Sequence, residues 1–181
     1  MILIAEIAGW FMSDIIRTEN NSWVFNTLLI YTGSFTLWIL SQADPFKTTK
    51  RNLEKGIFLY VVLGSINMIF FEGFRNYNAY SEMLLDLMVC SYCCYFFYKT
   101  LEESEYRNLY RYEYFWLAVG FLFSSLGSAI LYIFISSLTS FYKHTHINIY
   151  GYINSALNVV LYSSLIMSFI CRRRNTRLLP V

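Results

Sequence analysis

Long stretches without charge are the feature that most constrains how this chain can fold. The segment 23–40, WVFNTLLIYTGSFTLWIL, contains no Asp, Glu, Lys or Arg. A surface helix of a soluble protein carries charged residues along one face. A helix that crosses a hydrocarbon core about 30 Å thick needs about 20 mainly apolar residues instead. This segment is therefore predicted to span a membrane.

The same pattern recurs along the chain and predicts an all-α fold, a polytopic transmembrane helical bundle with six spans. The expected spans are residues 1–16, 23–40, 57–71, 82–98, 114–142 and 149–171. The connections are short, so neighbouring helices should run antiparallel and pack as a single domain over residues 1–181. The alternating segments of about 10 residues that are typical of a membrane β-barrel are missing from the sequence.

Composition agrees with a membrane protein and excludes several other classes. The 181 residues are 56% apolar, 20% aromatic and 14% charged, with a mean hydropathy of +0.41. Soluble domains are about one quarter charged, so a soluble enzyme, a disordered regulator and a nucleic-acid-binding module are all excluded. The net charge of +2 is too small to indicate a polyanionic partner, and no direct contact with nucleic acid is expected.

Basic residues gather after the second, fourth and sixth predicted spans. Of 14 Lys and Arg residues, those on this side are Lys47, Lys50, Arg51, Lys55, Lys99, Arg107, Arg111, Arg172, Arg173, Arg174 and Arg177. Only Arg17, Arg75 and Lys143 fall on the other side. Basic residues in short loops stay in the cytoplasm, so both termini are predicted to be cytoplasmic.

Five charged residues in or beside the predicted spans are candidates for binding a ligand or an ion. Glu6 and Asp86 lie within spans, while Glu72, Arg75 and Glu82 surround the outer turn between two of them. Inserting a charge at the centre of a span costs about 2.5–3.5 kcal/mol. One interpretation is an acidic outward-facing cavity for a cation, a proton or a cationic ligand. The alternative is a set of ordinary interfacial contacts, with Asp86 accepting hydrogen bonds from Tyr or Ser.

Amides and small residues within the spans predict contacts between helices. The amides are Asn26, Asn67, Asn154 and Asn158, and an amide in a membrane joins helices through hydrogen bonds worth about 1 kcal/mol. Gly120, Ser124 and Ser128 recur at every fourth position and allow a second helix to approach closely. The segment 149–171 has the same spacing of small residues, so we expect it to pack against 114–142.

No catalytic constellation is visible, and we expect neither enzymatic activity nor a cofactor. The sequence lacks a Gly-rich phosphate loop, a nucleophile elbow and a zinc-protease motif. His144 and His146 have no recognisable third and fourth ligand, so no metal site is predicted. Arg172, Arg173 and Arg174 form a basic collar that could contact anionic lipid headgroups, at about 1 kcal/mol per residue, or could only anchor the topology.

Several short motifs carry a resemblance that covers most of the chain. They are Glu6 with Gly9, Trp23-Val24-Phe25-Asn26, Phe70-Phe71-Glu72-Gly73, Tyr95-Phe96-Phe97-Tyr98, Phe115-Trp116, and Asn158 through Cys171. In this order they resemble a group of uncharacterised multi-span bacterial membrane proteins of about this size. The resemblance implies a multi-pass protein of the bacterial inner membrane and carries no activity with it.

Two functions remain open from the sequence. The first is a sensing, scaffolding or accessory membrane module that acts in the lipid bilayer as a homo-oligomer or with a partner membrane or cytoplasmic protein. The second is a channel, pore-forming effector or carrier that uses the intramembrane carboxylates Glu6 and Asp86.

Overall fold

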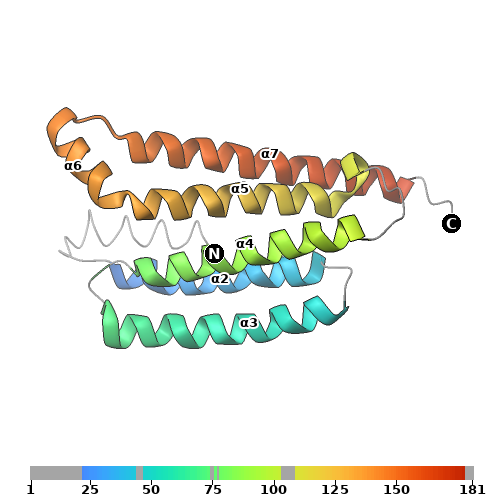
Figure 1. Cartoon of the computed structure of the whole chain (residues 1–181), viewed down its shortest axis with the longest axis horizontal. Helices are drawn as coiled ribbons and strands as arrows, with labels where there is room; N and C mark the ends of the chain where they lie inside the picture. Colours follow the sequence, from blue (N-terminus) through green and yellow to red (C-terminus); the bar gives the residue numbers. More distant parts are fainter. Residues whose placement is uncertain (1–21, 44–46, 74–75, 77, 103–108, 178–181) are drawn as a thin grey trace. The chain divides into compact units, whose positions relative to one another are not determined.

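The computed structural model describes residues 22–43, 47–73, 76, 78–102 and 109–177. Every regular element in these ranges is helical (Figure 1), which confirms the predicted all-α class for the described part of the chain. The α-helices are α2 (Ser22–Ala43), α3 (Lys47–Ile66), α4 (Ala79–Glu102), α5 (Glu113–Ile133), α6 (Ile135–Thr145) and α7 (Ile149–Arg177). A π-helical turn, η2 (Asn67–Phe71), extends α3, and a 3-10 turn, η3 (Leu109–Arg111), precedes α5.

Five helices are long and apolar enough to cross a membrane. The membrane-compatible segments are Trp23–Gln42, Lys50–Phe71, Ala79–Glu102, Glu113–Ile133 and Ile149–Asn175. They match five of the six predicted spans, although most run several residues further at one or both ends. The remaining predicted span, residues 1–16, lies outside the described residues.

The predicted single helix over 114–142 is wrong, because the structure breaks it at Phe134. This residue leaves the helical region with φ −97° and ψ 8°, and it separates α5 from α6. The sequence after the break is rich in Ser and Thr, whose hydroxyls compete for backbone hydrogen bonds. The Thr139 hydroxyl, for example, donates to the Ile135 carbonyl at 2.8 Å, a bond that commonly bends helices.

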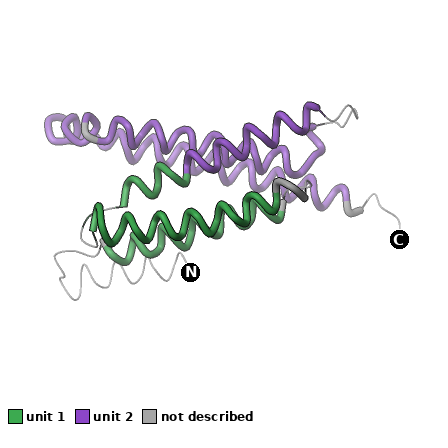
Figure 2. The backbone as a smooth tube through the Cα atoms, turned by 60° about the horizontal axis from the view of Figure 1, so that its bottom comes forward, with its two compact units in different colours: residues 1–85 green, residues 86–181 purple. Residues whose placement is uncertain are grey.

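The chain divides into two compact units, coloured separately in Figure 2, with the boundary between Leu85 and Asp86 inside α4. In the first unit, α2 packs against α3 through a close approach at Gly33. A Cβ added to Gly33 would lie 2.6 Å from the Tyr60 hydroxyl. Tyr60 is fully buried, and its hydroxyl donates to the Leu29 carbonyl at 3.3 Å. The missing side chain at Gly33 therefore makes room for the Tyr60 ring.

In the second unit, α5 packs against α7, as expected for segments 114–142 and 149–171. A Cβ added to Gly120 would lie 2.7 Å from the Ser164 Cβ, and one added to Gly127 would collide with the Leu157 side chain. Less exposed residues on α7 recur at alternating spacings of three and four, namely Asn154, Leu157, Leu161, Ser164, Ser168 and Cys171. This spacing is typical of two helices packed along one seam.

Aromatic side chains join the second half of α4 to the residues around η3 within the same unit. The Phe96 ring, only 2% exposed, stacks on Tyr112 with ring centroids 6.3 Å apart. The Phe97 ring meets Phe115 edge to face at 5.8 Å. Offset and edge-to-face pairs add about 0.5–1.5 kcal/mol each beyond area burial, so this contact fixes the start of α5 against α4.

The close approach at Gly120 predicts that Gly120→Ala will destabilise the protein by about 1–3 kcal/mol, the usual cost of overpacking. The added methyl group meets the Ser164 Cβ, which cannot rotate away. The free energy of unfolding in mixed micelles measures the effect.

The double variant Gly120→Ala with Ser164→Gly is the control, because it moves the small residue to the other helix. It is expected to recover most of the lost stability. Equal stability of the double variant and Gly120→Ala alone would contradict the predicted contact.

Candidate functional site

The densest group of polar side chains in the described residues lies in the first unit, where η2 ends and α4 begins. We call it the amide cluster and define it as Asn26, Asn67, Glu72, Asn76, Asn78 and Ser81. These residues come from α2, from η2 and the turn after it, and from the first turn of α4. Two of the amides, Asn26 and Asn78, are completely buried.

Local backbone structure brings these residues together. The π-helical turn ends with a hydrogen bond from the Glu72 N–H to the Asn67 carbonyl at 3.0 Å. Gly73 follows with φ 75°, a conformation that residues with a side chain rarely adopt. Asn78 immediately precedes α4, a position that favours Asn because its side chain can pair with groups of the first turn. The chain thus reverses direction between η2 and α4.

Asn26 links α2 to the turn that follows η2. Its Nδ2 donates to the Asn76 carbonyl at 2.8 Å, and its Oδ1 accepts from the Asn78 backbone N–H at 3.0 Å. Both groups of the amide are therefore paired with backbone far away in sequence. A fully buried amide that pairs with two distant backbone groups, one of them the buried Asn78 N–H, stabilises one arrangement of the three segments.

Asn67 and Asn78 link η2 to α4. The Asn67 amide donates to the Asn78 Oδ1 and lies 3.2 Å from the Ser81 Oγ. The Ser81 hydroxyl donates to the Asn78 Oδ1 at 2.9 Å, and the Asn78 Nδ2 donates to the Gly64 carbonyl at 3.4 Å. The side chains form a continuous network between α3, η2 and α4.

The Glu72 carboxylate is the one acidic group of the amide cluster. Its Oε2 accepts from the Asn67 Nδ2 at 2.6 Å, and both of its oxygens lie 3.4 Å from the Tyr80 backbone nitrogen. Tyr80 belongs to the first turn of α4, where unpaired N–H groups and the helix dipole favour a negative charge. Glu72 therefore has a structural role at the start of α4.

The other charged candidates lie on α4 or outside the described residues. Glu82 and Asp86 are both on α4, where Glu82 is half-buried and Asp86 is 6% exposed. Glu6 and Arg75 fall outside the residues that the structure describes. No group of three or more His, Cys, Asp and Glu within the described ranges could hold a metal ion.

The remaining candidates for helix packing lie on α5 and α7. Gly120 is in contact with α7, whereas Ser124 and Ser128 are half-buried on α5. Asn154 lies in the seam toward α5, but Asn158 is exposed. The two amides, four residues apart, thus have different surroundings.

The collar of Arg172, Arg173 and Arg174 is exposed at the end of α7. Two hydrogen bonds hold this end against η3. The Cys171 Sγ lies 3.5 Å from the Tyr110 carbonyl, and the Asn175 Nδ2 donates to the Arg111 carbonyl at 3.2 Å. The position of the three arginines is therefore fixed by the contact between α7 and η3.

Sequence reasoning missed Asn76, Asn78, Ser81 and Gly127, and for some of them a signal was present. Asn directly before an apolar helical segment is a helix-start signal, and Asn78 would have moved the start of the fourth span from residue 82 to 79. Gly127 also carried a signal, because it follows Gly120 by seven residues and therefore lies on the same face of the helix.

Comparison with protein families, with curated proteins and with solved structures finds no match. Function must therefore be inferred from the geometry of this chain.

The amide cluster predicts that Asn26→Ala will lower the free energy of unfolding by about 1–3 kcal/mol, because the Asn78 N–H and the Asn76 carbonyl lose their partner. The same change at the neighbouring Thr27, whose exposed hydroxyl bonds only within α2, should alter stability by less than about 0.5 kcal/mol. Thermal unfolding in one detergent compares the two variants. Similar losses for both would show that the network does not stabilise the fold.

Proposed function

We propose that the protein is an accessory membrane module, of the sensing or scaffolding type, that works by associating with other helices in the bilayer. The observation that carries the proposal is the exposure of Asn158 on α7. Asn158 is nine residues beyond Ile149, or about 14 Å along the helix at 1.5 Å per residue. That depth is near the middle of a hydrocarbon core about 30 Å thick.

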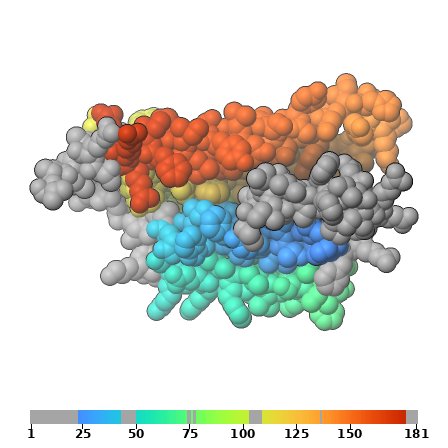
Figure 3. Space-filling model, turned by 180° about the vertical axis from the view of Figure 1, so that it is seen from behind, coloured from blue at the N-terminus to red at the C-terminus, as the bar shows by residue number. Residues whose placement is uncertain are grey.

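The environment of Asn158 supports a partner outside this chain. The seam of α7 toward α5 includes Asn154 and Leu157, whereas Asn158 is exposed beside large apolar residues. Its neighbours Val159 and Tyr162 are 64% and 62% exposed. Figure 3 shows side chains of α7 at the surface along the length of the helix. An amide facing hydrocarbon lacks hydrogen-bond partners, which favours association with another helix.

A second copy of the chain is the occupant that fits the chemistry of Asn158 best. A carboxamide has both donors and an acceptor, so two Asn158 side chains related by a two-fold axis can pair with each other. Hydrogen bonds of this kind between membrane helices are worth about 1–2 kcal/mol in model peptides. The same face would also accept a partner protein with a polar group at this depth.

The proposal predicts that Asn158→Leu will raise the dissociation constant of the dimer about 5- to 30-fold, the equivalent of 1–2 kcal/mol. The measurement is the fraction of co-localised, differently labelled chains in vesicles over a range of protein-to-lipid ratios. Because Asn158 has no role within the described fold, the unfolding free energy should change little.

Val160→Leu is the matched control, since Val160 is exposed on the same helix and carries no polar group. It should leave association unchanged. A wild-type chain that remains monomeric at all ratios would exclude self-association, and unaltered association of Asn158→Leu would exclude this face.

A second candidate function, a channel or carrier, is favoured by Asp86. This carboxylate lies inside a helix long enough to span the bilayer and is only 6% exposed. Ionisable groups buried in membrane spans often mark ion or proton pathways. Glu6, the other carboxylate of this hypothesis, is placed in a span by its sequence alone.

The channel hypothesis predicts proton or cation flux in liposomes that falls strongly in Asp86→Asn and Glu6→Gln. Glu54→Gln is the control, because Glu54 is an exposed residue of α3, and this variant should retain the wild-type flux. Absence of flux in the folded wild-type protein would remove the hypothesis.

We further propose that the six-span topology places both termini in the cytoplasm of a bacterial cell. Support comes from basic residues at one end of each unit. In the first unit, Lys50, Arg51 and Lys55 lie near the start of α3. In the second, Arg111 and the arginine collar lie where α7 is bonded to η3. Because basic residues in short loops are retained in the cytoplasm, both termini of the chain would be cytoplasmic.

A further inference from the structure

The helix α6 begins where the membrane span of α5 ends. The 21 residues of α5 extend about 31 Å at 1.5 Å per residue, which matches a hydrocarbon core of about 30 Å. The break at Phe134 follows at once, and α6 then runs out of line with α5 (Figure 1). If α5 crosses the bilayer, α6 starts at the depth of the lipid headgroups.

Most residues of α6 divide into an apolar face and a polar face. Apolar or aromatic side chains occur at Ile135, Leu138, Phe141 and Tyr142, and Phe134 directly precedes the helix. With 100° between successive residues, these positions cover about one third of the helix circumference. The opposite side carries Ser137, Ser140, Lys143 and His144. A helix with these two faces is typical of those that lie in the membrane surface.

The apolar face of α6 is only partly covered by the chain itself. Phe134 is 55% exposed, Phe141 41% and Tyr142 49%. Large aromatic side chains that face water would cost free energy in proportion to their apolar area. At the end of a membrane span, the surface that can cover them is the lipid itself.

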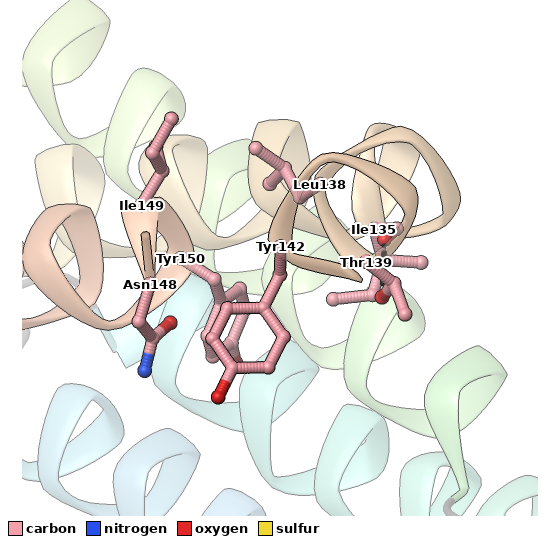
Figure 4. A pocket seen from close by; sticks show the side chains of 7 residues that line it. All are labelled: Ile135, Leu138, Thr139, Tyr142, Asn148, Ile149 and Tyr150. Carbon is pink, nitrogen blue, oxygen red and sulfur yellow. Dashed lines mark hydrogen bonds between the residues drawn. The ribbon is translucent and has the colours of Figure 1, made fainter. Parts of the chain in front are cut away.

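A cavity of about 180 Å³ opens between α6 and the first residues of α7. Its lining residues are Ile135, Leu138, Thr139, Tyr142, Asn148, Ile149 and Tyr150 (Figure 4). The Asn148 Oδ1 accepts from the Gly151 N–H at 2.9 Å, which fixes the amide at the start of α7. The cavity thus combines apolar walls with hydroxyl and amide groups. That mixture matches the level of a phospholipid where the acyl chains meet the glycerol esters.

We propose that α6 and the start of α7 form a phospholipid-binding surface in the plane of the membrane. The apolar face of α6 lies against acyl chains, and the cavity receives the upper part of one lipid. Lys143, on the opposite side of α6, lies at the level of the phosphates. This inference rests on the end of the α5 span and is independent of self-association through Asn158.

Photo-crosslinking of the full-length protein tests the proposal. The photoreactive residue p-benzoylphenylalanine replaces Phe141 on the apolar face or, in a matched variant, Ser140 on the polar face. Each protein is reconstituted in vesicles of phosphatidylethanolamine and phosphatidylglycerol, irradiated and weighed by intact mass spectrometry. Lipid adducts are expected to be several-fold more abundant for position 141 than for position 140.

Position 123 provides the positive control, because Phe123 is 58% exposed within the α5 span and should yield lipid adducts in any correctly inserted protein. With that control positive, equal adduct yields at positions 140 and 141 would overturn the proposal. Crosslinks from position 141 to another protein chain in place of lipid would overturn it as well, since they would identify a protein partner for this face.

Discussion

The need to pair every polar group in hydrocarbon is the constraint on which the rest of this structure depends. A helix pairs its own backbone internally, so five long helices can enter a bilayer without further help. Their ends and breaks cannot do so. Between η2 and α4, Asn26 pairs with the Asn76 carbonyl and the Asn78 N–H, which lie outside the helices, and Asn78 donates to the Gly64 carbonyl of α3. In the amide cluster, side chains therefore supply hydrogen bonds that the backbone supplies within the helices.

The same constraint explains why the observed helix contacts rely on glycine. In lipid, apolar side chains gain little by leaving acyl chains for one another, so close backbone approach and hydrogen bonds decide which helices pair. Gly33 admits the Tyr60 ring in the first unit, and Gly120 admits Ser164 in the second. Large aromatic residues such as Phe58 and Phe169 remain 73% and 69% exposed, as expected for side chains that face lipid.

Polar residues of the same type have different uses because of where the fold places them. Asn26 and Asn67 bond within the chain, whereas Asn158 is exposed at the edge of the α5 seam. Glu72 caps the start of α4, while Asp86 is buried further along that helix. The side chains of the amide cluster form hydrogen bonds within the first unit. The functional proposals therefore rest on Asn158, on Asp86 and on α6.

The helical class and the approximate positions of five spans followed from the sequence alone, because the length of an uncharged apolar segment is a local property that hydrocarbon thickness selects. The expected contact between segments 114–142 and 149–171 also followed, from the spacing of small residues. The break at Phe134, the network of Asn26, Asn67 and Asn78, and the different exposure of Asn154 and Asn158 came only from the tertiary structure. The network and the surroundings of the two amides depend on which distant segment lies beside them. The Ser- and Thr-rich sequence after Phe134 allows a break in the helix but does not require one, so the sequence alone did not decide it.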